Sequence, residues 1–169
     1  MKRSISKTLP LLLFVMAAII LLQNCKPRGA QSAVGGDAAS KAYITPGKYD
    51  EFYNFVSGGF SGQLSVYGLP SGRLFRVIPV FSVDPEKGYG FSEETKPMLN
   101  TSHGFIPWDD AHHPELSQTD GQVDGRWVFI NGNNTPRIAR IDLKTFRTEE
   151  IIEIPNSAGN HSSAFVTPG

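Results

Sequence analysis

The chain has 169 residues with 16 basic and 16 acidic side chains, so its formal net charge at pH 7 is zero. A balanced charge without a clustered basic patch gives no sign of nucleic-acid binding, and we expect no nucleic-acid partner. The single cysteine excludes a disulfide bond within the chain, so packing and hydrogen bonds alone must hold the fold together.

The N-terminal end of the chain has the pattern of an export signal. Basic residues at Lys2, Arg3 and Lys7 precede an uncharged stretch, Leu9 to Leu22. This stretch is shorter than the about 20 apolar residues that a membrane-spanning helix requires. The pattern therefore predicts a secretory signal peptide over residues 1–24 and a location in the periplasm.

Cys25 directly follows this signal, at the place of the lipid-carrying cysteine in bacterial lipoproteins. Asn24 before it and Lys26 after it depart from the usual lipoprotein pattern, so an ordinary cleaved signal is the alternative. A free buried thiol fits poorly with a cysteine at the edge of a polar segment. We therefore expect a lipid anchor on Cys25 that holds the protein at the membrane.

Residues 25–48 are expected to form a flexible tether between this anchor and a folded domain over residues 49–169. The stretch "KPRGAQSAVGGDAASKA", from Lys26 to Ala42, is small, polar and aperiodic. Segments of this composition lack the apolar residues needed to build a core. We assign no chemistry to the tether.

Downstream of the tether, β-strand patterns dominate. "QLSVYGLPSGRLFRVIPVF", residues 63–81, predicts two strands around a turn at Leu69–Gly72. "RWVFINGNN" predicts a strand that ends in a hairpin turn at Asn131–Gly132. "PRIARIDLKTFRTEEIIEIP", residues 136–155, predicts a further hairpin, and a helical turn is expected only around residues 93–99.

The first and last of these hairpins repeat each other at a constant offset of 74 residues along the chain, as from Leu64 to Ile138, which we call the repeat offset. The matching apolar residues are, in the same order, Leu64, Leu69, Val77 and Ile78 in one hairpin and Ile138, Leu143, Ile151 and Ile152 in the other. Repeated hairpins are typical of β-propellers, whose blades have ~40–50 residues, so roughly 30 residues remain for an insertion. Because a closed propeller needs ~4–8 blades, we expect an all-β fold made of the first blades of an incomplete propeller. A small β-sandwich with a decorated loop is the alternative.

The expected insertion holds the adjacent residues His112 and His113, shortly after Asp110. Imidazole is a common ligand of copper and zinc. Neighbouring side chains of an extended segment point to opposite faces, and Pro114 favours an extended His113. Two adjacent histidines therefore cannot easily chelate one small ion, but they could reach two metal atoms of a wide multinuclear cluster, or a bent backbone could bring them together. Asp110 should lie on the same side as His112 and could orient the imidazole or a substrate proton. A solvated polar loop is the alternative.

Other polar residues have structural explanations. Asp120 and Asp124 each precede a glycine, and without the ligand spacing of an EF-hand they indicate turns rather than calcium ligands. His103 has no partner at metal-ligand spacing. His161 follows the last strand in a loop of small residues, where by itself it is as readily a hydrogen-bonding residue as a ligand. The sequence contains no phosphate-binding glycine loop, nucleophile elbow or CxxC pair.

The chain closely resembles the N-terminal part of the nitrous-oxide reductases, most of all their atypical second clade, whose members commonly have a general secretory signal. The resemblance covers residues 49–169. It rests on four motifs in order: Asp-x-His-His, the "DGRW" strand, the "NGNNTPRIARID" hairpin and the loop "IPNSAGNH". It implies a seven-bladed β-propeller followed by a cupredoxin domain outside this sequence.

The same resemblance implies copper sites and a reaction. It places His112, His113 and His161 among the seven histidines that hold a tetranuclear copper–sulfide cluster at the propeller hub, with Asp110 beside the cluster near the substrate. It also implies a binuclear copper site in the cupredoxin domain, calcium in the full-length protein, and a head-to-tail homodimer that receives electrons from a cytochrome or cupredoxin. The implied reaction reduces nitrous oxide to dinitrogen and water with two electrons and two protons.

Two other functions stay open on the sequence alone. One is a non-catalytic lipoprotein propeller that serves as a binding platform, and the other is a histidine-ligated mononuclear zinc or iron enzyme. Further single histidines at strand ends and a cysteine-containing cupredoxin motif downstream would favour the copper enzyme. Because the other cluster ligands would lie beyond Gly169, we expect the isolated fragment to be inactive and at most a weak copper binder.

Overall fold

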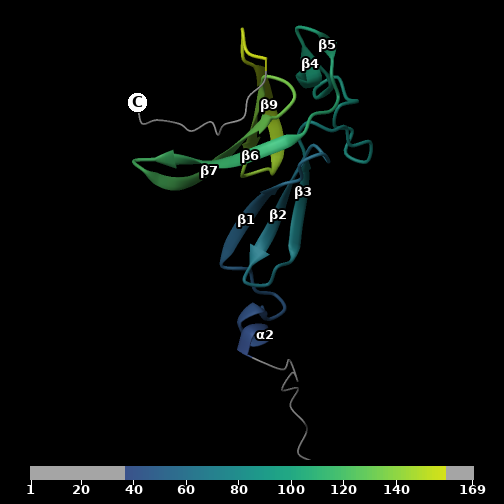
Figure 1. Cartoon of the computed structure of the whole chain (residues 1–169). Coiled ribbons are helices and arrows are strands. Elements are labelled where there is room, and N and C mark those ends of the chain that lie inside the picture. The colour runs from purple at the N-terminus through teal and green to yellow at the C-terminus, as the bar shows by residue number, and fades with distance from the viewer. Residues whose placement is uncertain (1–36, 159–169) are drawn as a thin grey trace, which may run out of the picture. The chain divides into compact units, whose positions relative to one another are not determined.

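The computed structural model describes residues 37–158 of the chain (Figure 1). Helix α2 (Asp37–Ala42) lies in the stretch predicted to be a tether. In the described part, neither this helix nor any other is long and apolar enough to span a membrane. The predicted signal peptide, Cys25 and His161 lie outside the described residues, so the expectations about them stay predictions.

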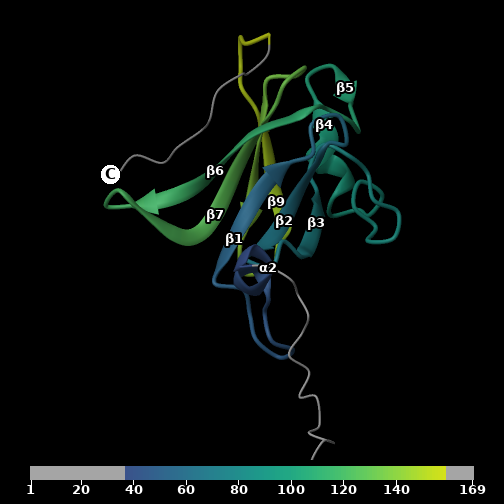
Figure 2. The ribbon, with the colours of Figure 1, turned by 60° about the horizontal axis from the view of Figure 1, so that its bottom comes forward.

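All strands belong to the compact unit that begins at Ala42, and they form two antiparallel sheets and a short ribbon. The first sheet, which Figure 2 shows with its strands side by side, has the order β1 (Phe52–Ser57), β2 (Gln63–Leu69) and β3 (Leu74–Pro79). The second sheet has the order β6 (Ala111–Thr119), β7 (Gln122–Gly132), β8 (Arg137–Asp142) and β9 (Arg147–Glu153). Between the sheets the chain forms the 3-10 helix η1 (Lys96–Leu99) and the ribbon of β4 (Asn100–Thr101) and β5 (Gly104–Phe105).

The all-β prediction is confirmed. In the second sheet, four antiparallel strands follow one another in chain order, as they do in a propeller blade. Neither sheet of the described part closes into a barrel. The two sheets are consistent with partial β-propeller blades. The strands predicted over residues 63–81 and 136–155 and the helical turn before Asn100 are all present.

Strand pairing reproduces the repeat offset found in the sequence. Leu64 pairs with Ile78 in the first sheet, and Ile138 pairs with Ile152 at the equivalent place in the second. The same offset relates the pairs of β1 with β2 to those of β7 with β8. The strands β1, β2 and β3 therefore correspond to β7, β8 and β9.

One hydrophobic core lies between the two sheets. Its buried residues come from both sheets and from the segments beside them: Leu64, Val66, Ile78, Val80, Phe81, Ala111, Val128, Ile130, Ala139 and Ile141. Only one face of each sheet contributes, as the alternating burial of β2 shows. Repeat-equivalent residues therefore differ in environment: Ile78 is 0% exposed, whereas Ile152 is 51% exposed.

The hairpin turn predicted at Asn131–Gly132 is wrong. Strand β7 continues through Gly132, and the chain turns over residues 133–136 instead. A Cβ atom at Gly132 would clash with Asp109 Oδ2, so a carboxylate from outside the hairpin packs directly on this backbone. This tertiary contact, rather than the local turn preference, decides where the strand ends.

The long loop expected around the two histidines is also wrong, because β6 occupies Ala111–Thr119. Its pairing with β7 outweighs a polar local sequence that contains a proline. The turn predicted at Asp120 is present, with a left-handed φ of 51°. Asp124 instead lies inside β7, where it accepts hydrogen bonds from the hydroxyls of Ser117 and Thr119. These bonds lower the pKa of Asp124, the largest effect coming from Ser117.

Substitutions at repeat-equivalent positions test the burial of the two sheets. Ile78→Ala should lower the free energy of unfolding by about 2–5 kcal/mol, because it removes buried methylene groups and leaves a cavity. Ile152→Ala should change it by less than about 1 kcal/mol, because that side chain is half exposed. Urea unfolding of both variants beside the parent chain measures the difference. Equal losses of unfolding free energy in the two variants would contradict the placement of Ile78 on a covered face and Ile152 on an exposed face.

Candidate functional site

The candidate site lies where the chain enters β6. Ala111 N donates a hydrogen bond to Gly59 O at 2.9 Å, which ties this entry to the loop between β1 and β2. His112 pairs with Asn131 of β7. These contacts from both sides position the backbone that carries Asp110 and His112.

The carboxylate of Asp110 lies beside the imidazole of His112, with His112 Nε2 at 3.1 Å from Asp110 Oδ2. Asn133 Nδ2 lies 3.4 Å from the same oxygen. The prediction that Asp110 and His112 share one side is thus confirmed. Asp110 is 4% exposed, and its Oδ1 has no hydrogen-bond partner among the described residues. An unpaired buried carboxylate oxygen is costly, and such atoms gather where a protein meets a ligand.

His113 has a bent backbone instead of the predicted extended one. Its φ is 45°, in the left-handed region that residues other than glycine seldom adopt. Between His112 and Glu115, β6 holds one residue more than β7 opposite it, which makes a β-bulge. Pro114 fits there because it has no N–H group to pair. The bulge brings the rings of His112 and His113 edge to face, with centroids 5.5 Å apart.

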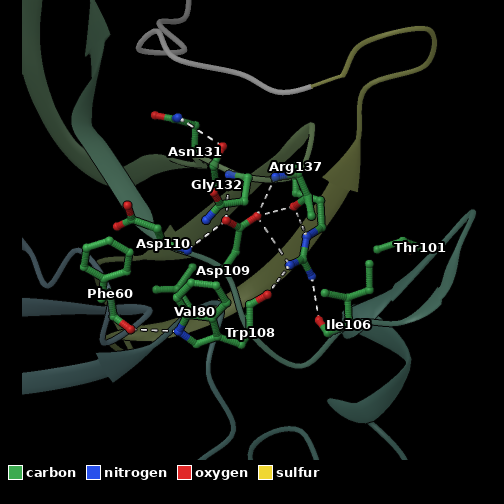
Figure 3. A network of polar contacts seen from close by, with 12 residues as sticks. Phe60, Val80, Thr101, Ile106, Trp108, Asp109, Asp110, Asn131, Gly132 and Arg137 are labelled. Atoms are coloured by element: carbon green, nitrogen blue, oxygen red, sulfur yellow. Dashed lines mark hydrogen bonds and ion pairs between the residues drawn. The ribbon is translucent and has the colours of Figure 1, made fainter.

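A buried carboxylate, Asp109, organises the backbone next to this site (Figure 3). Its Oδ1 accepts hydrogen bonds from the backbone N–H groups of Asp110 at 2.7 Å and Asn134 at 2.8 Å. Its Oδ2 accepts bonds from the N–H of Thr135 at 2.9 Å and from the Thr135 hydroxyl. The guanidinium of Arg137 lies 3.6 Å from Oδ2. Asp109 therefore joins the start of β6 to the turn between β7 and β8.

Arg137 is the fully buried partner of Asp109, with 1% exposure. It donates hydrogen bonds to the carbonyl oxygens of Ile106 at 2.9 Å and Trp108 at 3.1 Å. Its guanidinium also lies over the ring of Phe81, 5.0 Å from the centroid. Burial lowers the pKa of Arg137, while the charge of Asp109 raises it. The guanidinium thus holds the segment before β6, which contains Ile106 and Trp108, next to β8.

A glycine-rich loop between β1 and β2 forms the other side of the site. Trp108 Nε1 donates to Phe60 O at 2.7 Å, and the two rings lie parallel with centroids 6.2 Å apart. Gly59 has a φ of 56°, and a Cβ atom there would lie 3.5 Å from Asp110 Oδ1. A Cβ atom at Gly62 would clash with the backbone carbonyl of Phe81. Gly62 therefore allows the close approach of this loop to Phe81, whereas Gly59 allows the left-handed backbone of the loop.

Sequence reasoning missed Asp109, Arg137 and the glycine loop. A signal for Arg137 was available, because strict alternation in "RIARID" places it on the same face as Ala139 and Ile141. The cluster of glycines in "SGGFSG" likewise indicates a close approach of backbone. No local pattern singles out Asp109 from its neighbour Asp110.

The remaining histidines are not brought to this site by the described residues. His103 lies in the exposed turn of the β4–β5 ribbon. The ribbon is bound to the end of β9 by Ser102, whose N–H and hydroxyl donate to the carboxylate of Glu153 at 2.7 and 2.8 Å. These bonds lower the pKa of Glu153. His161 lies outside the described residues, so its approach to His112 stays a prediction.

The residue types at the site fit copper. Imidazole nitrogen is a ligand that copper accepts readily, and a carboxylate can orient it from behind. The unpaired Oδ1 of Asp110 shows that the site's polar groups are not satisfied within the described residues. That part of the chain contains no group of three or more His, Cys, Asp or Glu residues arranged to hold a metal ion. It therefore contains imidazole and carboxylate donors that copper, zinc or iron would accept, without a complete set of metal ligands among the described residues.

The chain is similar to several proteins that are described as nitrous-oxide reductases. The chain is 40% identical over 134 residues to the "Nitrous-oxide reductase" of Pseudomonas fluorescens, a match that covers 79% of this chain and 21% of the relative. It is 38% identical over 125 residues to the protein of that name from Stutzerimonas stutzeri, covering 74% of this chain and 19% of the relative. For Ralstonia nicotianae the identity is 35% over 144 residues, with 80% and 22% covered. No family model matches. The chain spans about a fifth of the length of these relatives.

The role of the buried Arg137 can be tested by comparison with Arg140, a more exposed arginine on the same strand. Arg137→Met should lower the free energy of unfolding by about 3–5 kcal/mol, because it leaves the buried carboxylate of Asp109 without its cation. Arg140→Met removes an ion pair with Glu150 from a side chain that is 39% exposed, and should cost less than about 1 kcal/mol. Urea unfolding compares the two. If Arg137→Met lowered the free energy of unfolding as little as Arg140→Met, the structural role of the Asp109–Arg137 pair would be contradicted.

Proposed function

Because this chain is homologous to the nitrous-oxide reductases, we propose that it forms the N-terminal part of a copper oxidoreductase that reduces nitrous oxide to dinitrogen and water. The reaction consumes two electrons and two protons. The observation that carries the proposal is the 35–40% identity to relatives of that description over about four-fifths of the chain. Since the chain spans about a fifth of each relative, the activity is proposed for the complete protein.

In this proposal His112 and His113 hold part of a copper–sulfide cluster, together with His161. Their rings lie edge to face with centroids 5.5 Å apart, so the bent backbone brings both imidazoles to one place. The bulge at His113 supports the role, because a strained backbone persists where the surrounding structure and function require it. When bound, such a cluster supplies the electrons that nitrous oxide takes up.

Asp110 has two roles in the proposal. Its Oδ2 lies 3.1 Å from His112 Nε2, and a hydrogen bond from that nitrogen would select the imidazole tautomer with its lone pair on Nδ1. That nitrogen would then face the metal. Its Oδ1, buried and without a hydrogen-bond partner among the described residues, would orient a proton at the reacting oxygen of nitrous oxide.

The family resemblance also extends the proposal to the cellular setting. Export by residues 1–24 would bring the protein to the periplasm, and a lipid on Cys25 would anchor it there. The complete protein would contain the binuclear copper site and calcium. It would form a head-to-tail homodimer that receives electrons from a cytochrome or cupredoxin.

The test uses the complete, copper-loaded protein. His112→Ala should abolish the visible charge-transfer bands of the copper–sulfide centre together with the reduction of nitrous oxide. Asp110→Asn keeps the shape of the side chain but weakens the orientation of His112, and should lower copper affinity or activity about 10- to 100-fold. Absorption spectra, metal analysis and gas-chromatographic assay of nitrous oxide are the measurements.

His103→Ala is the matched control, because His103 lies in the exposed β4–β5 turn and should leave spectrum and rate unchanged. Zinc or iron in place of copper would instead support a mononuclear metal enzyme. Full copper content and activity in His112→Ala would overturn the assignment of this residue. A complete protein that binds no metal would favour a non-catalytic propeller.

A further inference from the structure

The plane of the Asp110 carboxylate is important for the candidate site, because its Oδ2 lies 3.1 Å from His112 Nε2. Asp110 itself does not fix this plane, since rotation about the bond to the carboxylate group of an aspartate is only weakly restricted. The Oδ1 atom is buried and has no hydrogen-bond partner among the described residues. The described residues therefore hold the carboxylate through Oδ2.

The turn between β7 and β8 contacts Oδ2 through Asn133. The backbone N–H of Asn133 donates to Asp110 O at 2.8 Å, and its side-chain Nδ2 donates a long hydrogen bond to Asp110 Oδ2 at 3.4 Å. The nitrogen of the amide must face the carboxylate, because the amide oxygen has no hydrogen to donate. A carboxylate oxygen can accept two hydrogen bonds, so Oδ2 has room for both Asn133 Nδ2 and His112 Nε2.

The backbone of this turn is held without the side chain of Asn133. Asp109 Oδ1 accepts hydrogen bonds from the N–H groups of Asp110 at 2.7 Å and Asn134 at 2.8 Å. This contact and the backbone bond from Asn133 to Asp110 join the turn to the start of β6. Both contacts stay when the amide of Asn133 is removed. The amide therefore restrains the carboxylate of Asp110 rather than the fold.

We propose that Asn133 is a positioning residue for His112. Its amide holds Asp110 Oδ2 where that oxygen accepts the Nε2–H of His112, so the imidazole keeps its lone pair on Nδ1 and points it in one direction. The effect on copper rests on the proposed function, in which His112 Nδ1 faces the metal. The placement of the imidazole depends only on contacts within the described residues and is measurable without metal.

The first test is proton–nitrogen NMR of the complete, metal-free protein with isotope-labelled histidine. In the parent, the Nε2 proton of His112 should exchange slowly with solvent, and its signal is assigned by its loss in His112→Ala. Asn133→Ala removes the amide, whereas Asn133→Leu keeps the size of the side chain but has no N–H donor. Both variants should speed the exchange about tenfold, the effect of losing one hydrogen bond to a charged group.

The second test uses the complete, copper-loaded protein. Both Asn133 variants should shift the absorption bands of the copper centre and lower copper affinity about 10-fold, the low end for residues that orient a metal ligand. Asn134→Ala is the matched control, because the side chain of Asn134 is exposed and its contact with Asp109 uses the backbone N–H. It should match the parent in both tests. Urea unfolding of all these variants should also match the parent, since the backbone contacts of the turn are kept.

An unchanged exchange rate in both Asn133 variants would overturn the positioning role. A parent-like Asn133→Leu beside a fast-exchanging Asn133→Ala would also overturn it, since packing rather than the amide would then explain the effect. The same holds for equal effects in Asn134→Ala, which would mean a general loosening of the turn. Faster exchange with unchanged copper spectrum and affinity would overturn the consequence for the metal. A complete protein that binds no copper would refute the proposed function, while the exchange rate would still decide the role of Asn133.

Discussion

The buried pair of Asp109 and Arg137 is the interaction on which the candidate site depends. Asp109 accepts backbone hydrogen bonds from the turn between β7 and β8, and Arg137 donates to carbonyl groups of the segment before β6. The same pair therefore sets where β7 ends and where β6 begins. A buried charge whose partner is removed is strongly destabilising, so the two side chains specify this one arrangement of the chain.

The geometry of the site follows from that restraint. With the entry to β6 held in place, Asp110 lies beside His112, and the bulge in β6 turns His113 toward the same ring. The left-handed backbone of His113 is of order 1–3 kcal/mol less favourable than an extended one, roughly the cost of any such strained residue. The pairing of β6 with β7 on both sides of the bulge offsets that cost. Site and scaffold are thus parts of one hydrogen-bonded structure.

The repeat explains why this site lies in a row that the described residues leave partly exposed, with Ile152 51% exposed. His112, Asn131, Ile138 and Ile152 form one row across the four strands of the second sheet. The equivalent row of the first sheet is covered, because the second sheet packs on it. The row of His112 and the covered row of the first sheet are thus repeat equivalents with different surroundings.

The amino-acid sequence by itself indicated the hairpins, their repeat offset and the resemblance to the nitrous-oxide reductases, since all three rest on local alternation and on motifs read in order. The proximity of Asp110 and His112 was also predictable, because alternate residues of an extended segment share one side. Only the tertiary structure decided that β6 is a strand, that β7 continues past Asn131, and that His113 is bent. The physical reason is that each outcome depends on contacts between distant segments, such as the carboxylate of Asp109 on the backbone of Thr135. Local preference is weaker than a satisfied buried charge, so no reading of neighbouring residues could supply these features.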